Sequence, residues 1–86
     1  MQTLVILPDL GVSDAATLSV SFWFADEGDE VIEGDRLVEL VAGPVTIDVP
    51  APATGRLVEI RVTEEDAVHA GDILAIVESE HDDASD

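Results

Sequence analysis

The stretch that decides the fold is EGDEVIEGDRLVEL at Glu27–Leu40, because a second version of it, EEDAVHAGDILAIV, occurs at Glu64–Val77. In each copy the pattern predicts a strand, an acidic turn, one apolar anchor, a Gly-Asp turn and another strand. Glycine supplies the positive φ that a tight turn needs, and aspartate can hydrogen-bond its own backbone. Two copies in a chain of 86 residues predict two similar sheets related by an approximate two-fold axis. The positions that coincide at a spacing of 37 residues are Glu27/Glu64, Asp29/Asp66, Val31/Val68, Gly34/Gly71, Asp35/Asp72 and Leu37/Leu74.

The segments around these turns alternate between apolar and polar residues. Alternation of period two is typical of half-buried strands, and no segment keeps a period of 3.6 long enough to predict a helix. Many short strands separated by Gly and Asp turns predict an all-β sandwich or barrel. The alternating apolar positions are Leu18, Val20, Phe22 and Phe24; Val45, Ile47 and Val49; and Val58, Ile60 and Val62. The residues expected in the core are Val20, Phe22, Val31, Leu37, Val58, Ile60, Val68 and Leu74.

A hairpin is expected between the two copies, over Leu37–Val49, with Ala42-Gly43-Pro44 at its tip. After it, VPAPATG (Val49–Gly55) contains two prolines, which remove ladder donors, so we expect an extended corner where the chain crosses between sheets.

The chain is expected to form one domain over residues 1–79. Within it, Pro8–Ala16 is predicted to be a surface loop. Residues 80–86 are polar and acidic and are predicted to be a disordered tail.

Charge and composition exclude several classes of function. Twenty acidic residues against three basic ones, all arginine, give a net charge of −17, which repels nucleic acid and anionic lipid. The chain is nevertheless 47% hydrophobic, unlike a disordered acidic chain. Without cysteine there is no disulfide, thiolate metal site or thiol nucleophile. No apolar run is long enough for a membrane span, and no basic region followed by an apolar stretch suggests a signal peptide, so we expect a cytoplasmic protein.

Two interpretations of the acidic surface compete. In the first, the charge serves solubility alone. Alternatively, an acid excess with no lysine resembles the proteins of salt-accumulating archaea, because molar salt screens self-repulsion. We favour the second interpretation and expect the cytoplasm of a halophilic archaeon.

The order of these landmarks resembles the biotinyl/lipoyl attachment domain family from about Leu4 to Val77. The resemblance begins with Pro8-Asp9-Leu10-Gly11, continues through Phe22-Trp23-Phe24 and both repeat copies, and includes Val49-Pro50-Ala51-Pro52 between them. It implies a flattened barrel or sandwich of two antiparallel sheets of about four strands each, in agreement with the strand pattern.

In that family a lysine at the tip of the central hairpin receives lipoate or biotin. The resemblance places the equivalent position at Pro44, preceded by Gly43. Proline has no primary amine, and the chain contains no lysine elsewhere. We therefore expect no cofactor and no carrier activity, although Gly43-Pro44 still suits a tight turn.

Other chemistry finds little support in the pattern. His69 and His81 are the only histidines, and neither has the paired spacing of a zinc or catalytic site. The acidic groups at 26–30 and 64–66 lack calcium-loop spacing and are better interpreted as solvated turns. No nucleophile–base pair can be named, so we expect no catalytic residue, no metal site and no enzymatic activity. Trp23 is expected to be a packing residue.

The function expected from the sequence is protein contact. The resemblance implies a lipoyl-like interaction module linked to a 2-oxoacid dehydrogenase or carboxylase assembly, with no nucleic-acid or membrane partner. The alternative is a structural adaptor domain of a secretion or efflux-type assembly. Neighbouring genes would distinguish the two.

Overall fold

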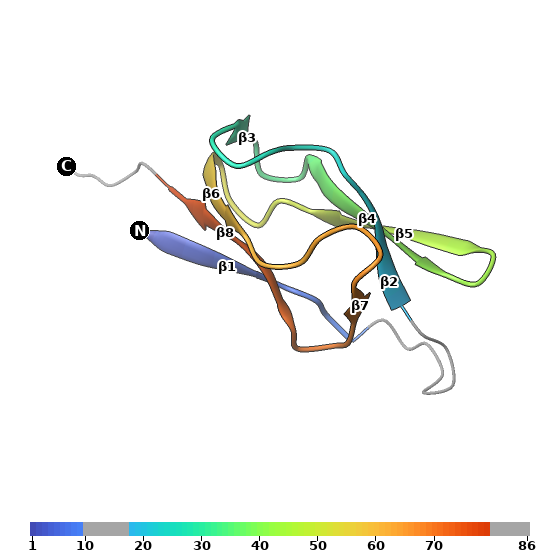
Figure 1. Cartoon of the computed structure of the whole chain (residues 1–86). Coiled ribbons are helices and arrows are strands. Elements are labelled where there is room, and N and C mark those ends of the chain that lie inside the picture. The colour runs from blue at the N-terminus through green and yellow to red at the C-terminus, as the bar shows by residue number, and fades with distance from the viewer. Residues whose placement is uncertain (10–17, 80–86) are drawn as a thin grey trace.

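Eight short strands build the molecule, which we describe from a computed structural model for residues 1–9 and 18–79 (Figure 1). They form two four-stranded sheets in which every strand pair is antiparallel, which confirms the predicted all-β, two-sheet architecture. One sheet has the order β1 (Gln2–Ile6), β8 (Ile73–Glu78), β6 (Gly55–Ile60) and β3 (Glu30–Val31). The other has the order β5 (Val45–Pro50), β4 (Arg36–Ala42), β2 (Leu18–Trp23) and β7 (Ala67–Val68).

The described part of the chain contains no helix long and apolar enough to cross a membrane. Most of the predicted loop at Pro8–Ala16 and the whole predicted tail at 80–86 lie outside the described residues.

The two halves of the chain repeat each other in space. The sheet orders match when β1, β2, β3 and β4 exchange with β5, β6, β7 and β8. Backbone hydrogen bonds repeat at the same spacing: the N–H of Gly28 donates to the Leu57 carbonyl, and the N–H of Glu65 donates to the Val20 carbonyl, both at 2.7 Å. The approximate two-fold axis predicted from the sequence repeat is confirmed, and each sheet takes two strands from each half.

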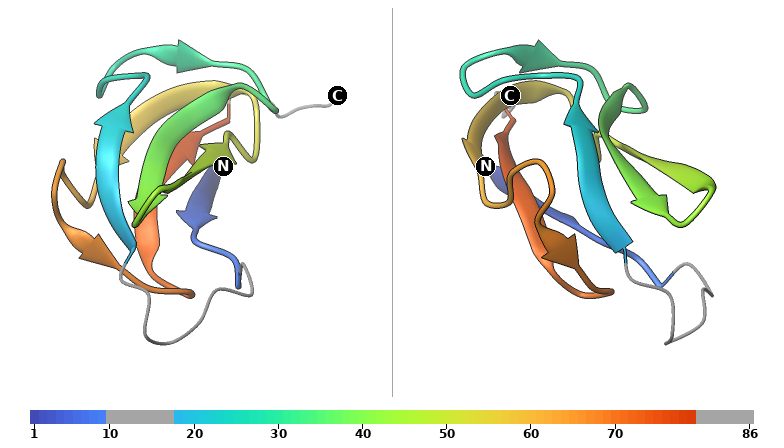
Figure 2. Two further views of the ribbon diagram at one scale, coloured as in Figure 1. Left: turned by 90° about the vertical axis from the view of Figure 1, so that its right-hand side faces the viewer. Right: turned by 45° about the vertical axis from the view of Figure 1, so that its right-hand side comes forward.

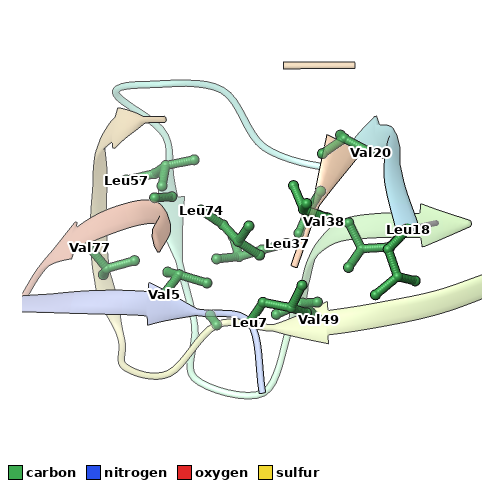
Figure 3. Packing of buried hydrophobic residues seen from close by; sticks show 14 of the residues in the cluster. Val5, Leu7, Leu18, Val20, Leu37, Val38, Val49, Leu57, Leu74 and Val77 are labelled. Atoms are coloured by element: carbon green, nitrogen blue, oxygen red, sulfur yellow. The ribbon is translucent and has the colours of Figure 1, made fainter. Parts of the chain in front are cut away.

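Turned views show the two sheets facing each other (Figure 2). Their inner faces hold a core of aliphatic side chains without a single aromatic ring, and the described residues include no buried polar or charged side chain. Figure 3 shows how side chains from both sheets interleave in this core. The most deeply buried large residues are Leu7, Val20, Leu37, Val38, Leu40, Leu57, Val68, Leu74 and Val77.

Two of the predicted core residues are wrong. Phe22 is 49% exposed and Val58 is 37% exposed, and Phe24, which the alternation grouped with Phe22, is 39% exposed. Each strand has a β-bulge, at Ser21 in β2 and at Val58 in β6, where the register shifts by one residue. A bulge inserts one residue into the alternation, so side chains beyond it change faces.

The same shift turns Trp23 inward. Its side chain packs against the core as predicted, and its indole N–H donates to the Val62 carbonyl at 3.0 Å. Ile60, the equivalent residue of the second half, is also partly buried against the core. Trp23 and Val62 therefore join the two sheets along one side of the barrel.

Candidate functional site

The hairpin formed by β4 and β5 projects from one end of the barrel (Figures 1 and 2). Its pairing runs from Arg36 opposite Pro50 to Ala42 opposite Val45, which leaves only Gly43 and Pro44 in the loop. Ala42 is thus the last residue of β4, and the loop has two residues. The structure places the predicted site residues together at this tip.

The loop sequence suits its backbone. Gly43 has φ of 61°, and the proline ring fixes a negative φ at Pro44, which is the sign pattern of the type II′ turns that favour two-residue hairpins. A Cβ added at Gly43 would meet no atom within 4 Å, so the backbone angle and not the available space favours glycine here.

The tip offers no group that could form an amide with a carboxylic acid. Leu40–Ile47 contains no amine, thiol, imidazole or carboxylate, and its only side-chain nucleophile is the Thr46 hydroxyl. Val45 is 53% exposed beside the loop. Charged groups begin below the tip, where the guanidinium of Arg36 forms an ion pair with Oδ2 of Asp48 at 3.5 Å. The hairpin therefore presents a neutral, apolar and unreactive end.

His69 lies in the second Gly-Asp turn, and its side chain is 80% exposed. Its backbone N–H donates to Oδ2 of Asp72 at 2.8 Å, whereas its Nδ1 lies 3.8 Å from the same oxygen. This places His69 at the surface, as expected. His81 lies outside the described residues. Among residues 1–9 and 18–79 there is no group of three side chains able to hold a metal ion.

The acidic turns use their carboxylates on their own backbone. Oδ2 of Asp29 accepts the N–H of Asp26 at 2.9 Å, and Oδ2 of Asp66 accepts the N–H of Thr63 at 2.8 Å. In both cases aspartate caps the residue three positions before it, a local bond that stabilises turns. These two acids have a structural role in the fold.

Phe22 and Phe24 form an exposed aromatic pair, although the alternation of the sequence places both on the inner face. Their ring centroids lie 5.2 Å apart with an interplanar angle of 79°, and the guanidinium of Arg36 lies 4.6 Å from the Phe24 centroid. The repeat held a signal that could have found them. Residues equivalent to Phe22 and Phe24 in the second half are Glu59 and Arg61, which no solvent-free core would accept.

Comparison with known proteins adds three similarities in sequence. Residues 3–77 match the model of the biotin/lipoyl family, described as "Biotin-requiring enzyme". The chain is 38% identical over 79 residues to the dihydrolipoyllysine-residue succinyltransferase component of a 2-oxoglutarate dehydrogenase complex from Bartonella vinsonii subsp. berkhoffii. It is 32% identical over 73 residues to the dihydrolipoyllysine-residue acetyltransferase component of a pyruvate dehydrogenase complex from Corynebacterium glutamicum. The alignments cover 92% and 85% of this chain but only 19% and 11% of those proteins.

Solved structures resemble the chain over nearly its whole length. The lipoyl domain of the 2-oxoglutarate dehydrogenase complex from Azotobacter vinelandii superposes with a TM-score of 0.68 at 28% identity, covering 90% of this chain and 99% of that domain. A single-chain, multi-domain long-chain acyl-CoA carboxylase superposes with a TM-score of 0.75 at 23% identity, covering 94% of this chain and 7% of that protein. The second similarity supports the fold alone.

Proposed function

Because this chain belongs to the biotin/lipoyl family, we propose that it is a non-enzymatic lipoyl-fold domain that makes protein contacts within a 2-oxoacid dehydrogenase or carboxylase assembly, without carrying a cofactor. One observation carries the proposal. The hairpin is retained, but its loop is Gly43-Pro44 and the chain has no lysine, so no side chain can form the amide that a lysine-linked cofactor requires.

The partner class is drawn from the relatives. Their names refer to components of 2-oxoglutarate and pyruvate dehydrogenase complexes, and the lipoyl domain from Azotobacter vinelandii matches this chain almost end to end. A partner that recognises the shape of such a domain meets the same two-sheet body here. What it meets at the hairpin tip is an apolar turn in place of an amine.

The absence of enzymatic activity is part of the proposal. Among the described residues the exposed His69 lies near Asp72 alone, and the carboxylates of Asp29 and Asp66 accept hydrogen bonds from the backbone of their own turns. None of these groups forms the nucleophile–base arrangement that general acid–base or covalent catalysis needs.

The first experiment tests the missing carrier chemistry. The protein is incubated with lipoate ligase and ATP, and separately with biotin ligase and ATP, and its intact mass is measured. We expect no change, whereas an authentic lipoyl domain treated in parallel gains one lipoyl group. A side-chain adduct of either cofactor on this protein would refute the proposal.

The second experiment tests contact. Purified components of the 2-oxoacid dehydrogenases and acyl-CoA carboxylases of the same organism are titrated with the protein in a calorimeter. We expect saturable binding to one component and competition by that organism's authentic lipoyl or biotinyl domain. Absence of binding to every component would refute the assignment to these assemblies.

A further inference from the structure

The exposed aromatic pair, Phe22 in β2 and Phe24 just after it, can be compared with the equivalent residues in the second half of the molecule. Phe22 and Phe24 correspond to Glu59 and Arg61 at the 37-residue spacing. Both pairs follow a β-bulge, and the N–H groups of Phe24 and Arg61 each donate at 2.8 Å to equivalent carbonyls, of Leu37 and Leu74.

In the second half this position holds an ion pair, with Nε of Arg61 3.7 Å from Glu59, and both side chains are about half exposed. The fold therefore accepts a solvated charged pair at these two positions. Nothing in the backbone requires phenyl rings at Phe22 in β2 and at Phe24 just after it, so their exposure indicates a surface that a partner covers.

A hollow of about 540 Å³ lies beside the pair, between β2 and the segment that follows β6. Phe22, Trp23 and Ile60 provide its apolar surface, and Asp26 and Glu64 provide carboxylates. Both carboxylates belong to exposed residues. Within the described residues neither carboxylate forms a hydrogen bond or ion pair, unlike those of Asp29 and Asp66.

We propose that this aromatic face, formed by Phe22, Phe24, Trp23, Asp26 and Glu64, docks a basic segment of a partner protein whose arginine or lysine side chain enters the hollow. The proposal rests on the contact function proposed above and names the surface and the chemistry of the partner. The apolar stem of such a side chain would lie on Phe22 and Trp23, and its charged end would meet the two carboxylates.

Charge complementarity selects this occupant. A net charge of −17 repels a second copy of the chain and an anionic membrane, while it attracts a cationic segment. The molecule also shows that the ring pair accepts a guanidinium, because that of Arg36 already lies over the Phe24 ring at 4.6 Å. We therefore expect the aromatic face to be covered by a basic protein segment and not to remain exposed to solvent.

The test uses an acetylated Leu-Arg-Leu-Arg amide as probe and the same peptide with citrulline for arginine as its uncharged match. Titrations are made in about 1 M potassium chloride, where the screening length of about 3 Å suppresses non-specific attraction to the acidic surface. Trp23 is the only tryptophan and lines the hollow, so its fluorescence reports occupancy. We expect saturable fluorescence change with the arginine peptide and about tenfold weaker binding of the citrulline peptide.

The decisive variant is the double substitution Phe22→Glu/Phe24→Arg, which copies the second half and leaves the net charge unchanged. We expect it to bind the arginine peptide about tenfold more weakly than the parent chain. Equal binding by this variant, or equal binding of the two peptides, would overturn the proposal.

Asp26→Asn/Glu64→Gln removes the carboxylates without touching the rings, so it tests the face independently if the first variant fails to fold. Glu59→Gln, on the opposite sheet, is the control and should bind as the parent does.

Sedimentation tests the remaining occupant. We expect a monomer at every salt concentration, and a dimer abolished by Phe22→Glu/Phe24→Arg would assign the face to self-association and overturn the proposal. The outcome is separable from that of the contact function. A dehydrogenase or carboxylase component that binds the double variant as tightly as the parent would refute the aromatic face and leave the contact function standing. If the protein binds the arginine peptide but no dehydrogenase or carboxylase component, the contact function is refuted and the aromatic face stands.

Discussion

Gly28 and Glu65 occupy equivalent turns in the two halves, and both have positive φ, 97° and 77° respectively. Their N–H groups make the same hydrogen bond at 2.7 Å. Glycine adopts this conformation freely, whereas an L-residue with a Cβ pays about 1–2 kcal/mol for it. The first half thus has the favourable residue, and the second half holds the same turn under strain.

Glu65→Gly should therefore stabilise the protein. Relief of strain is offset in part by the greater freedom of glycine in the unfolded chain, about 0.4–1 kcal/mol, so we expect a net gain of about 0.5–1 kcal/mol in the free energy of unfolding. Urea denaturation followed by circular dichroism measures it. Glu65→Gln removes the same charge without freeing the backbone. If that variant gains as much stability as Glu65→Gly, charge and not backbone strain explains the effect.

Leu37 and Leu74 are equivalent core residues, and both are fully buried. Truncating either to alanine leaves a cavity between the sheets, and we expect each to lower the free energy of unfolding by about 2–5 kcal/mol. The two losses should be similar because the surroundings repeat. Phe22→Ala, at a position 49% exposed, should cost no more than about 1 kcal/mol. A larger loss at Phe22 than at Leu74 would show that the bulge in β2 is misplaced. Urea midpoints in high salt provide the comparison.

Pro44→Lys should restore the missing amine without disturbing the hairpin. Gly43 provides the positive φ of the turn, and the next position takes a negative φ that any L-residue adopts. We expect lipoate ligase to add one lipoyl group to this variant, detected by intact mass. Val45→Lys, one residue away and also exposed, is the matched control and should react much less. If the Val45→Lys variant reacts preferentially, Pro44 is not the position equivalent to the attachment lysine.

Stability should rise with monovalent salt well into the molar range. At −17 the native surface repels itself, and the unfolded chain relieves the repulsion by expanding. The screening length falls from about 10 Å at 0.1 M to about 3 Å at 1 M, so potassium chloride removes a cost that the native state bears. Thermal melts followed by circular dichroism test this. A midpoint that stays flat between about 0.1 and 2 M would leave the charge a role in solubility alone and remove the argument for a high-salt cytoplasm.

Mild acid should replace part of the salt effect. Protonating carboxylates lowers the negative charge and hence the repulsion, so at about 0.1 M salt the melting midpoint should rise as the pH is lowered toward about 4, where Asp and Glu side chains ordinarily take up protons. At about 2 M salt the same change in pH should do much less. An equal rise at both salt concentrations would point to protonation of specific groups and not to general repulsion.

Most of the fold could be predicted from the sequence repeat, and the errors in the predicted core arise from the β-bulges. The glycines at 28, 34 and 71 mark turns between strands because each has a positive φ, whereas the turn at Glu65 has a positive φ without a glycine to mark it. The alternation failed at Phe22 and Val58 because a single inserted residue, which no local pattern marks, reverses the faces of a strand. Aligning the two copies would have exposed the error, since a charged residue in one copy marks an outward position in both.

The hairpin and its Gly43-Pro44 turn were predictable because this pair suits only a narrow set of turns, whereas Ala42, which was also expected at the tip, is the last residue of β4. The hollow beside Phe22 was not predictable. It depends on Ile60 and Glu64 approaching β2 from the other half of the chain, and alternation within one strand carries no information about such distant neighbours.

The way in which the halves share their sheets makes them inseparable. In one sheet the first half supplies the two edge strands and the second half the two inner ones, and in the other sheet the roles reverse. A peptide ending at the hairpin loop would contain only the edge strands of one sheet and the inner strands of the other, so its apolar side chains would have no facing sheet to pack against. It could complete both sheets only by associating with the other fragment or with a second copy of itself. Severing the chain between Gly43 and Pro44 should thus yield two fragments that are unstructured apart and that rebuild the barrel when mixed.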